Sequence, residues 1–158
     1  MRALLASPSS SSRNESGGLS QRLLHLNWLQ HRQIARQIAA FDLTVPQFYT
    51  LITLINLGGS ATMGTLSREL NQVSATMTGI VDRLVREGLV ERSRSNEDRR
   101  AVLVTLTPRG YEIVEKAWAQ SLNALDRMLS QMSDSERELA VKLLDALMAQ
   151  LANGWHRN

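Results

Sequence analysis

The residues best suited to chemistry in this sequence are arginines near the middle of the chain. Asp98, Arg99 and Arg100 lie in the charged, turn-forming stretch Ser95 to Arg100, directly before the alternating segment Val102 to Thr107. Guanidinium groups bind phosphates through charge-assisted hydrogen bonds, and a nearby carboxylate can hold one of them extended. The stretch therefore suits contact with an anionic polymer, although a solvated charge run at a hairpin tip has the same composition.

A second group of residues, earlier in the chain, suits contact with DNA bases. Between Ser74 and Gly88 apolar residues recur at helical spacing, so small, hydroxyl-bearing and basic side chains share the opposite face. A thin outer face lets a helix approach base edges, and hydroxyls can bond phosphates or bases. Gly79 costs such a helix about 1 kcal/mol relative to alanine; close approach to DNA would explain it, and so would chance tolerance in a well-packed helix. The predicted DNA-binding residues are Ser74, Ala75, Thr76, Thr78, Gly79, Arg83 and Arg86, with Arg94, Asp98, Arg99 and Arg100 from the hairpin that follows.

Two short helices and a hairpin are expected to position these residues. The segments 63–70 and 74–88 read as helices joined by a tight turn, which is typical of a helix-turn-helix. Leu89 to Arg94 and Ala101 to Thr107 read as paired strands. Val102, Val104 and Leu106 share one face, which is expected to pack the hairpin onto the module. A hairpin in this place is a wing. The buried stripe of the second helix is predicted to be Met77, Ile80, Val81, Leu84 and Val85.

Longer helices flank this predicted module. One runs from Leu19 to Phe41. The next is capped by Thr44, has Pro46 in its first turn and stops at Gly58-Gly59. Its apolar residues are Phe48, Leu51, Ile52 and Ile55. A long helix follows from Pro108 to about Met132, and Ser133 with Glu136 forms a capping box for the last one. These helices have more apolar surface than so small a module can cover. We therefore expect a dimer.

Composition narrows the function classes. The chain has 158 residues, a net charge of +3, 43% hydrophobic residues and no cysteine, so disulfides and cysteine-based redox sensing are excluded within it. No apolar run approaches the roughly 20 residues that span a bilayer. The three histidines do not cluster, and neither a metal-ligand spacing nor a Gly-rich phosphate loop occurs. We expect no metal, no cofactor and no enzymatic activity, and we interpret the Ser-rich residues 1–18 as a disordered tail rather than a transit peptide.

Three stretches together resemble the MarR family of bacterial winged helix-turn-helix regulators. "LTVPQFYTLITL" resembles the family's L-T-x-x-Q-F-x-x-L helix, and "SATMTGIVDRLVREGLVER" resembles its recognition helix and first wing strand. "DRRAVLVTLTPRG" resembles the wing signature, with Asp98 and Arg100 at the D and R of D-x-R. The resemblance runs from about Leu19 to the end of the chain and keeps the family's order throughout.

The resemblance implies a mainly α fold with a small β-hairpin wing: a winged helix-turn-helix module at 43–107 and a helical dimerisation region at 19–42 and 108–158. It implies a cytoplasmic homodimer that binds a pseudo-palindromic operator in double-stranded DNA, with Thr76 and Thr78 on the recognition helix and Arg100 in the minor groove. It further implies a repressor released by a small aromatic or anionic lipophilic ligand. By position alone, His25, Trp28 and Arg32 are predicted to line the ligand pocket.

Two other functions fit the same sequence. The chain could be a DNA-binding regulator that responds to no ligand, or a protein-interaction dimer that kept the fold and lost DNA binding. The basic wing and the thin recognition face favour DNA binding over a purely structural dimer. Because the chain has no cysteine, it cannot use the thiol chemistry of the family's peroxide-sensing branch.

Overall fold

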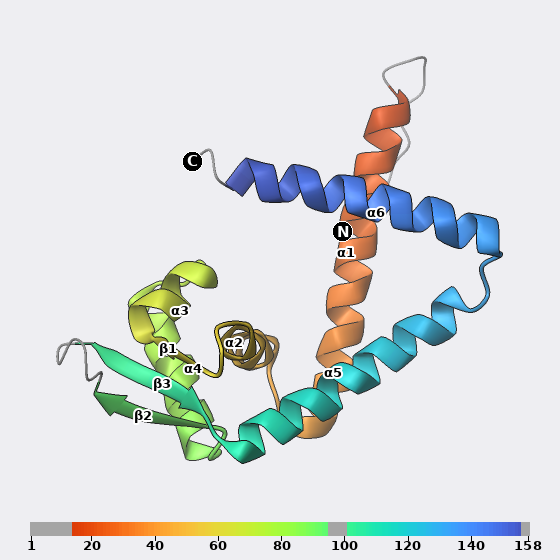
Figure 1. Ribbon diagram of the computed structural model, residues 1–158. Helices are drawn as coiled ribbons and strands as arrows, with labels where there is room; N and C mark the ends of the chain where they lie inside the picture. The colour runs from red at the N-terminus through yellow and green to blue at the C-terminus, as the bar shows by residue number, and fades with distance from the viewer. Residues whose placement is uncertain (1–13, 95–100, 156–158) are drawn as a thin grey trace, which may run out of the picture. The chain divides into compact units, whose positions relative to one another are not determined.

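The computed structural model describes residues 14–94 and 101–155 and divides into two compact units, one extending to Val114 and the other beginning at Glu115. Figure 1 shows short helices with a three-stranded sheet in the middle of the chain, and longer helices toward both ends of the sequence. The predicted wing-tip residues Asp98, Arg99 and Arg100 lie outside the described residues.

Helix α1 (Asn14–Ile38) begins earlier than predicted, so residues 14–18 do not belong to a disordered tail. Asn14 and Glu15 are residue types that helix starts favour, which offsets the flexibility of the glycines that follow. The helix ends in a 3-10 turn, η2 (Ala39–Phe41), closed by Asp42 in the left-handed conformation at φ 57°.

Helix α2 (Val45–Asn56) starts where the sequence predicts. The backbone N–H of Thr44 donates to Oε1 of Gln47 at 2.8 Å, and Pro46 occupies the first turn. The fully buried apolar residues include Phe48, Leu51 and Leu54. Leu54 thus takes the core position that the sequence analysis gave to Ile52 and Ile55, both of which are only half-buried.

Helices α3 (Met63–Glu69) and α4 (Ser74–Arg86) form the predicted helix-turn-helix. Thr62 caps α3 by accepting a hydrogen bond from the N–H of Thr65 at 3.1 Å. On α4 the predicted stripe is buried at Met77, Val81 and Leu84 and half-buried at Ile80. The prediction for Val85 was wrong: it is 38% exposed, because it lies at the edge of the apolar stripe, turned away from the core.

The sheet has three antiparallel strands in the order β1-β3-β2. The predicted hairpin is β2 (Val90–Arg94) with β3 (Val102–Leu106), and β1 (Ser60–Thr62) adds to the free edge of β3. β1 was not predicted because three residues are too few to show an alternation. Val104 and Leu106 are buried as expected, but Val102 is 39% exposed, because it pairs with Arg94 at the outer end of the hairpin.

The start of helix α5 (Pro108–Leu129) explains the T-x-x-G part of the wing signature. The Thr107 hydroxyl donates to the Gly88 carbonyl at 2.8 Å and accepts the Gly110 N–H at 3.0 Å. A Cβ at Gly110 would stand 2.1 Å from the carbonyl oxygen of Leu89. Only glycine lets the helix begin this close to Leu89, the residue directly before β2.

The second unit contains the later part of α5 and helix α6 (Asp134–Trp155). The predicted capping box is present: Glu136 Oε2 accepts the N–H of Ser133 at 2.8 Å and its hydroxyl at 2.7 Å. These hydrogen bonds lower the pKa of the Glu136 carboxyl. Among the described residues no single helix is long and apolar enough to cross a membrane; only α1 and α2 together meet the length and composition, across an 85° bend.

Candidate nucleic-acid interface

The outward face of α4 is open along its length. All seven α4 residues predicted to contact DNA are exposed, from Ser74 and Thr76 at the start to Arg83 and Arg86 in the last turn. Cations in the last turn also complement the negative end of the helix dipole. The face therefore has small side chains at one end and guanidinium groups at the other, as a helix that lies against DNA requires.

Nothing in the described part of the chain requires a glycine at position 79. A Cβ built at this position meets nothing within 4 Å, and the backbone is ordinary helix. Close packing against the rest of the protein thus does not explain the glycine. Its absent side chain leaves a strip of helix backbone open to whatever binds this face.

Two of the predicted threonines differ in their hydrogen bonds. The Thr78 hydroxyl donates to the carbonyl of Ser74 at 2.9 Å, one turn back along the helix. Within the described residues, the Thr76 hydroxyl makes no such bond and is exposed. Thr76 therefore has a hydroxyl available to a base or phosphate without loss of an internal bond.

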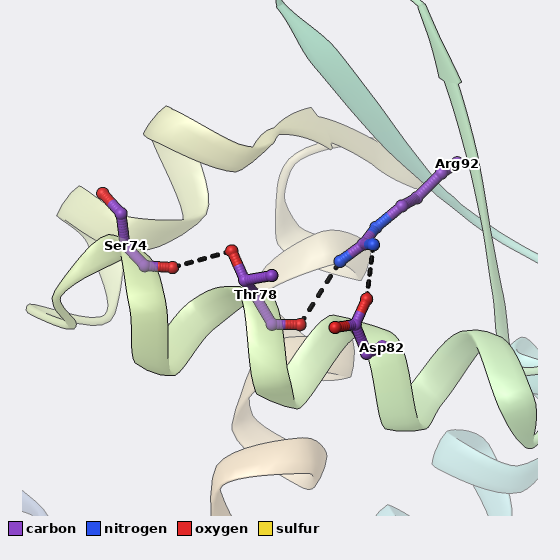
Figure 2. Close-up of polar contacts among 4 residues, drawn as sticks. All are labelled: Ser74, Thr78, Asp82 and Arg92. Carbon is purple, nitrogen blue, oxygen red and sulfur yellow. Dashed lines mark hydrogen bonds and ion pairs between the residues drawn. The ribbon is translucent and has the colours of Figure 1, made fainter.

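A contact that was not predicted from the sequence joins the wing to α4. Figure 2 shows Arg92 reaching from β2, with Nη1 donating to Oδ1 of Asp82 at 2.5 Å and Nη2 donating to the Thr78 carbonyl at 3.3 Å. We call this contact the Arg92 bridge. Spacing gives only part of this contact: Thr78 and Asp82 are four residues apart on one helix face, and Arg92 follows Val90 at period two on one strand face. The pairing of β2 with β3 is needed to direct that strand face toward α4.

A second polar contact secures the other end of α4. Gln47 is 3% exposed, and its Nε2 donates to both carboxylate oxygens of Glu87, the C-cap of α4, at 3.1 Å. The same side chain caps α2 through Thr44. The glutamine of the L-T-x-x-Q-F stretch therefore connects the start of α2 with the end of α4.

A groove of about 270 Å³, which we call the α2–α4 groove, lies beside the exposed face of α4. Its lining combines the apolar residues Pro46 and Ile80 with Thr76 and Arg83. Thr44, Gln47 and Gly79 complete the lining. A molecule in this groove would cover part of the face predicted to meet DNA.

The three residues predicted for a ligand pocket do lie together. The ring of His25 meets that of Trp28 edge to face at a centroid distance of 5.8 Å. The guanidinium carbon of Arg32 lies 4.7 Å from the centre of the Trp28 ring. All three are exposed on α1, Trp28 by 44%, so they form an aromatic and cationic surface rather than an enclosed cavity.

The predicted wing residues are only partly described. Arg94 is exposed at the outer end of β2, in register with Val102. Asp98, Arg99 and Arg100 fall between the described parts of the hairpin. The hairpin strands therefore fix where the wing begins, and the contacts of its tip remain predictions.

The sequence of this chain is similar to those of known transcriptional regulators. A sequence profile of the MarR family matches residues 43–102. The uncharacterized HTH-type transcriptional regulator YfiV of Bacillus subtilis is 31% identical over 112 residues, covering 71% of this chain and 69% of that protein. The multiple antibiotic resistance protein MarR of Salmonella typhimurium is 32% identical over 103 residues, covering 65% of this chain and 71% of that protein. This chain belongs to the MarR family.

The MarR fold extends beyond the profile match. A solved MarR family protein from Bacillus stearothermophilus aligns with a TM-score of 0.82 at 25% identity, covering 90% of this chain and 99% of that one. The predicted winged helix-turn-helix architecture is therefore confirmed. The chain is a MarR-type transcriptional regulator, which places it in a family of regulators rather than enzymes.

Proposed function

We propose that this regulator binds a pseudo-palindromic operator as a homodimer and represses transcription until a small ligand releases it. The observation that carries the proposal is the exposed face of α4, where small residues, among them Gly79 with open space around its Cα, precede Arg83 and Arg86. In this proposal α4 enters the major groove, and the wing, with Arg100 at its tip, reaches the minor groove. Residues 43–107 form the DNA-binding module in the cytoplasm.

Apolar exposure supports the proposed dimer. In the second unit Trp118, Leu122, Leu139 and Leu144 are among the large apolar residues exposed to solvent, and α1 separately exposes Leu24. Leaving this much apolar surface in water is unfavourable, and a second copy would cover it. Residues 19–42 and 108–158 are therefore the proposed dimerisation region.

Two places could hold the effector. The exposed cluster of His25, Trp28 and Arg32 offers a ring to stack on and a cation for an acidic group. The α2–α4 groove is lined by apolar residues and by Arg83, which would supply a cation. Both suit an aromatic or lipophilic anion, and a ligand in the groove would compete directly with DNA for the face of α4.

The DNA-binding proposal is tested by selecting genomic fragments on the purified protein. We expect an enriched inverted repeat, and a log affinity for it that falls with log salt by about 0.9 for each phosphate neutralised. Arg100→Ala should weaken operator binding in a gel-shift titration while the dimer persists. No enriched repeat and no salt dependence would instead favour the protein-interaction dimer.

The effector proposal is tested without DNA by thermal-shift screening against phenolic acids. A ligand that binds the folded state raises its melting temperature by mass action. Trp28→Ala should abolish the shift if the ligand uses the α1 cluster, whereas Arg83→Gln should abolish it if the ligand uses the groove. A flat response across the screen would favour a regulator that responds to no ligand.

A further inference from the structure

We propose that Arg92 is a positioning residue for DNA reading: the Arg92 bridge sets the wing against the recognition helix, and its effect is on discrimination between operator and other DNA. This inference rests on the proposed DNA binding and assigns a role to a residue that the predicted contact set did not include. Asp82 and the Thr78 carbonyl are the two acceptors through which it acts.

The register of the strands determines the face on which the Arg92 side chain lies. Arg92 pairs with Val104, and Val90 pairs with Leu106. Directly paired residues of antiparallel strands present their side chains on the same face. Since Val90, Val104 and Leu106 are all buried, this is the face toward the helices, and Arg92 is the next residue outward on it. The guanidinium is therefore delivered to α4 where the apolar core ends.

The geometry of the bridge suits positioning. Its two bonds come from different nitrogens of one planar guanidinium, and its acceptors are a side chain and a backbone carbonyl of the same helix turn. Thr78 is itself a predicted contact residue. The bridge therefore links the strand leading to the wing tip directly to the part of α4 expected to meet the bases.

Its energetic effect should appear in binding more than in folding. The side chains of Arg92 and Asp82 are 30% and 50% exposed, and ion pairs this open to solvent contribute little to stability. A fixed distance between two DNA-contacting elements matters when both must fit one site at once. An operator contacted by α4 and the wing together should lose more affinity than non-specific DNA, which is bound mainly through phosphates.

The bridge gives Arg92 a role that differs from that of Arg94. Arg94 lies on the same strand face, two residues further out, and is predicted to contact DNA directly. Loss of a phosphate contact lowers the slope of log affinity against log salt by about 0.9. Loss of a positioning contact leaves that slope unchanged.

The experiment measures affinity for the selected operator and for a scrambled duplex across a salt series. The variants are Asp82→Asn, Arg92→Gln, their double variant and the charge exchange Asp82→Arg with Arg92→Asp; Arg94→Gln serves as the phosphate-contact comparison. Ser93→Ala, exposed on the opposite face of β2, is the matched control. Thermal unfolding establishes that each variant is folded.

We expect each single variant of the bridge to lower operator affinity about tenfold, within the range of coupled ion pairs, and to leave scrambled DNA nearly unaffected. The double variant should lose no more than either single one, and the charge exchange should regain part of the loss. The salt slope should fall for Arg94→Gln and not for Arg92→Gln.

Three results would overturn the assignment. If Arg92→Gln weakens both duplexes equally and lowers the salt slope while Asp82→Asn has no effect, Arg92 is a phosphate contact. If the parent protein binds its operator and neither bridge variant changes that affinity, the bridge has no role in reading. If the parent shows no operator preference, the proposed function itself fails, and the positioning role fails with it.

Discussion

At the scale of single residues, glycine serves two opposite purposes in this chain. At Gly110 a side chain would collide with the backbone of Leu89, whereas at Gly79 it would meet only open space. The first glycine serves the fold and the second serves no internal contact of the described residues. Substituting alanine at each position separates a structural requirement from a functional one.

Gly110→Ala should destabilise the protein by about 2–4 kcal/mol, because a Cβ placed 2.1 Å from a carbonyl oxygen forces the backbone to move. The free energy of unfolding in urea measures the change. An unchanged midpoint would mean that α5 can begin elsewhere without cost, which would contradict the account of the T-x-x-G stretch.

Gly79→Ala should act in the other direction on stability. Alanine is favoured over glycine inside a helix by about 1 kcal/mol, and nothing in the described chain opposes the added methyl group. We expect a more stable protein that binds its operator more weakly, as measured by urea unfolding and gel-shift titration of one preparation. Equal operator affinity would show that DNA does not approach this strip of backbone.

Single residues also mark the limits of reading the sequence. The Thr44 cap and the buried Met77 follow from local rules and are confirmed. Val85 and Val102 were predicted to be buried and are exposed, because periodicity assigns a side chain to a face but not the extent of the core beneath that face. The Arg92 bridge needs the register of a hairpin, which spacing alone suggests only once the strands are paired.

At the scale of elements, the recognition helix is positioned by its neighbours. Among the described residues, Gln47 of α2 contacts its C-cap residue Glu87 and Arg92 of β2 contacts its side. The helices and the hairpin were predictable because each carries a cap or a clear period. β1 was not, since its three residues gain their pairing only from β3.

Gln47→Ala should lower the free energy of unfolding by about 1–3 kcal/mol, because it leaves the Glu87 carboxylate without its buried partner. Gln72→Ala is the matched control: that glutamine is exposed, so its loss should change stability by less than about 0.5 kcal/mol. Equal effects of the two variants would mean that the link between α2 and α4 contributes nothing.

The cap of α6 predicts a pH dependence. The hydrogen bonds from the Ser133 hydroxyl and N–H hold the folded pKa of Glu136 below its ordinary value, so the contribution of its ionised form is present above the unfolded pKa and is lost as pH falls through the folded pKa. The melting temperature of Glu136→Gln should therefore lie below that of the parent at pH 7 and approach it at pH 3. A difference that persists unchanged in acid would contradict the cap.

At the scale of the whole molecule, sequence and fold together establish a MarR-type regulator. The sequence alone could carry the resemblance that far, because the family signature coincides with caps, turns and close approaches that the fold requires. It could not establish the bound state. The operator contacts, the dimer and the effector site each involve a second molecule, so the sequence of this chain defines only one side of each contact.

Hydroxyl-radical footprinting of the selected operator tests the central claim most directly. A homodimer with one α4 in each half-site should protect two symmetric patches separated by about one helical turn, 10–10.5 base pairs, or a multiple of it. Arg100→Ala should reduce protection in the minor groove flanking each patch. A single unsymmetric patch would contradict binding as a homodimer with one α4 in each half-site. Uniform protection that disappears with added salt and shows no half-sites would contradict it as well.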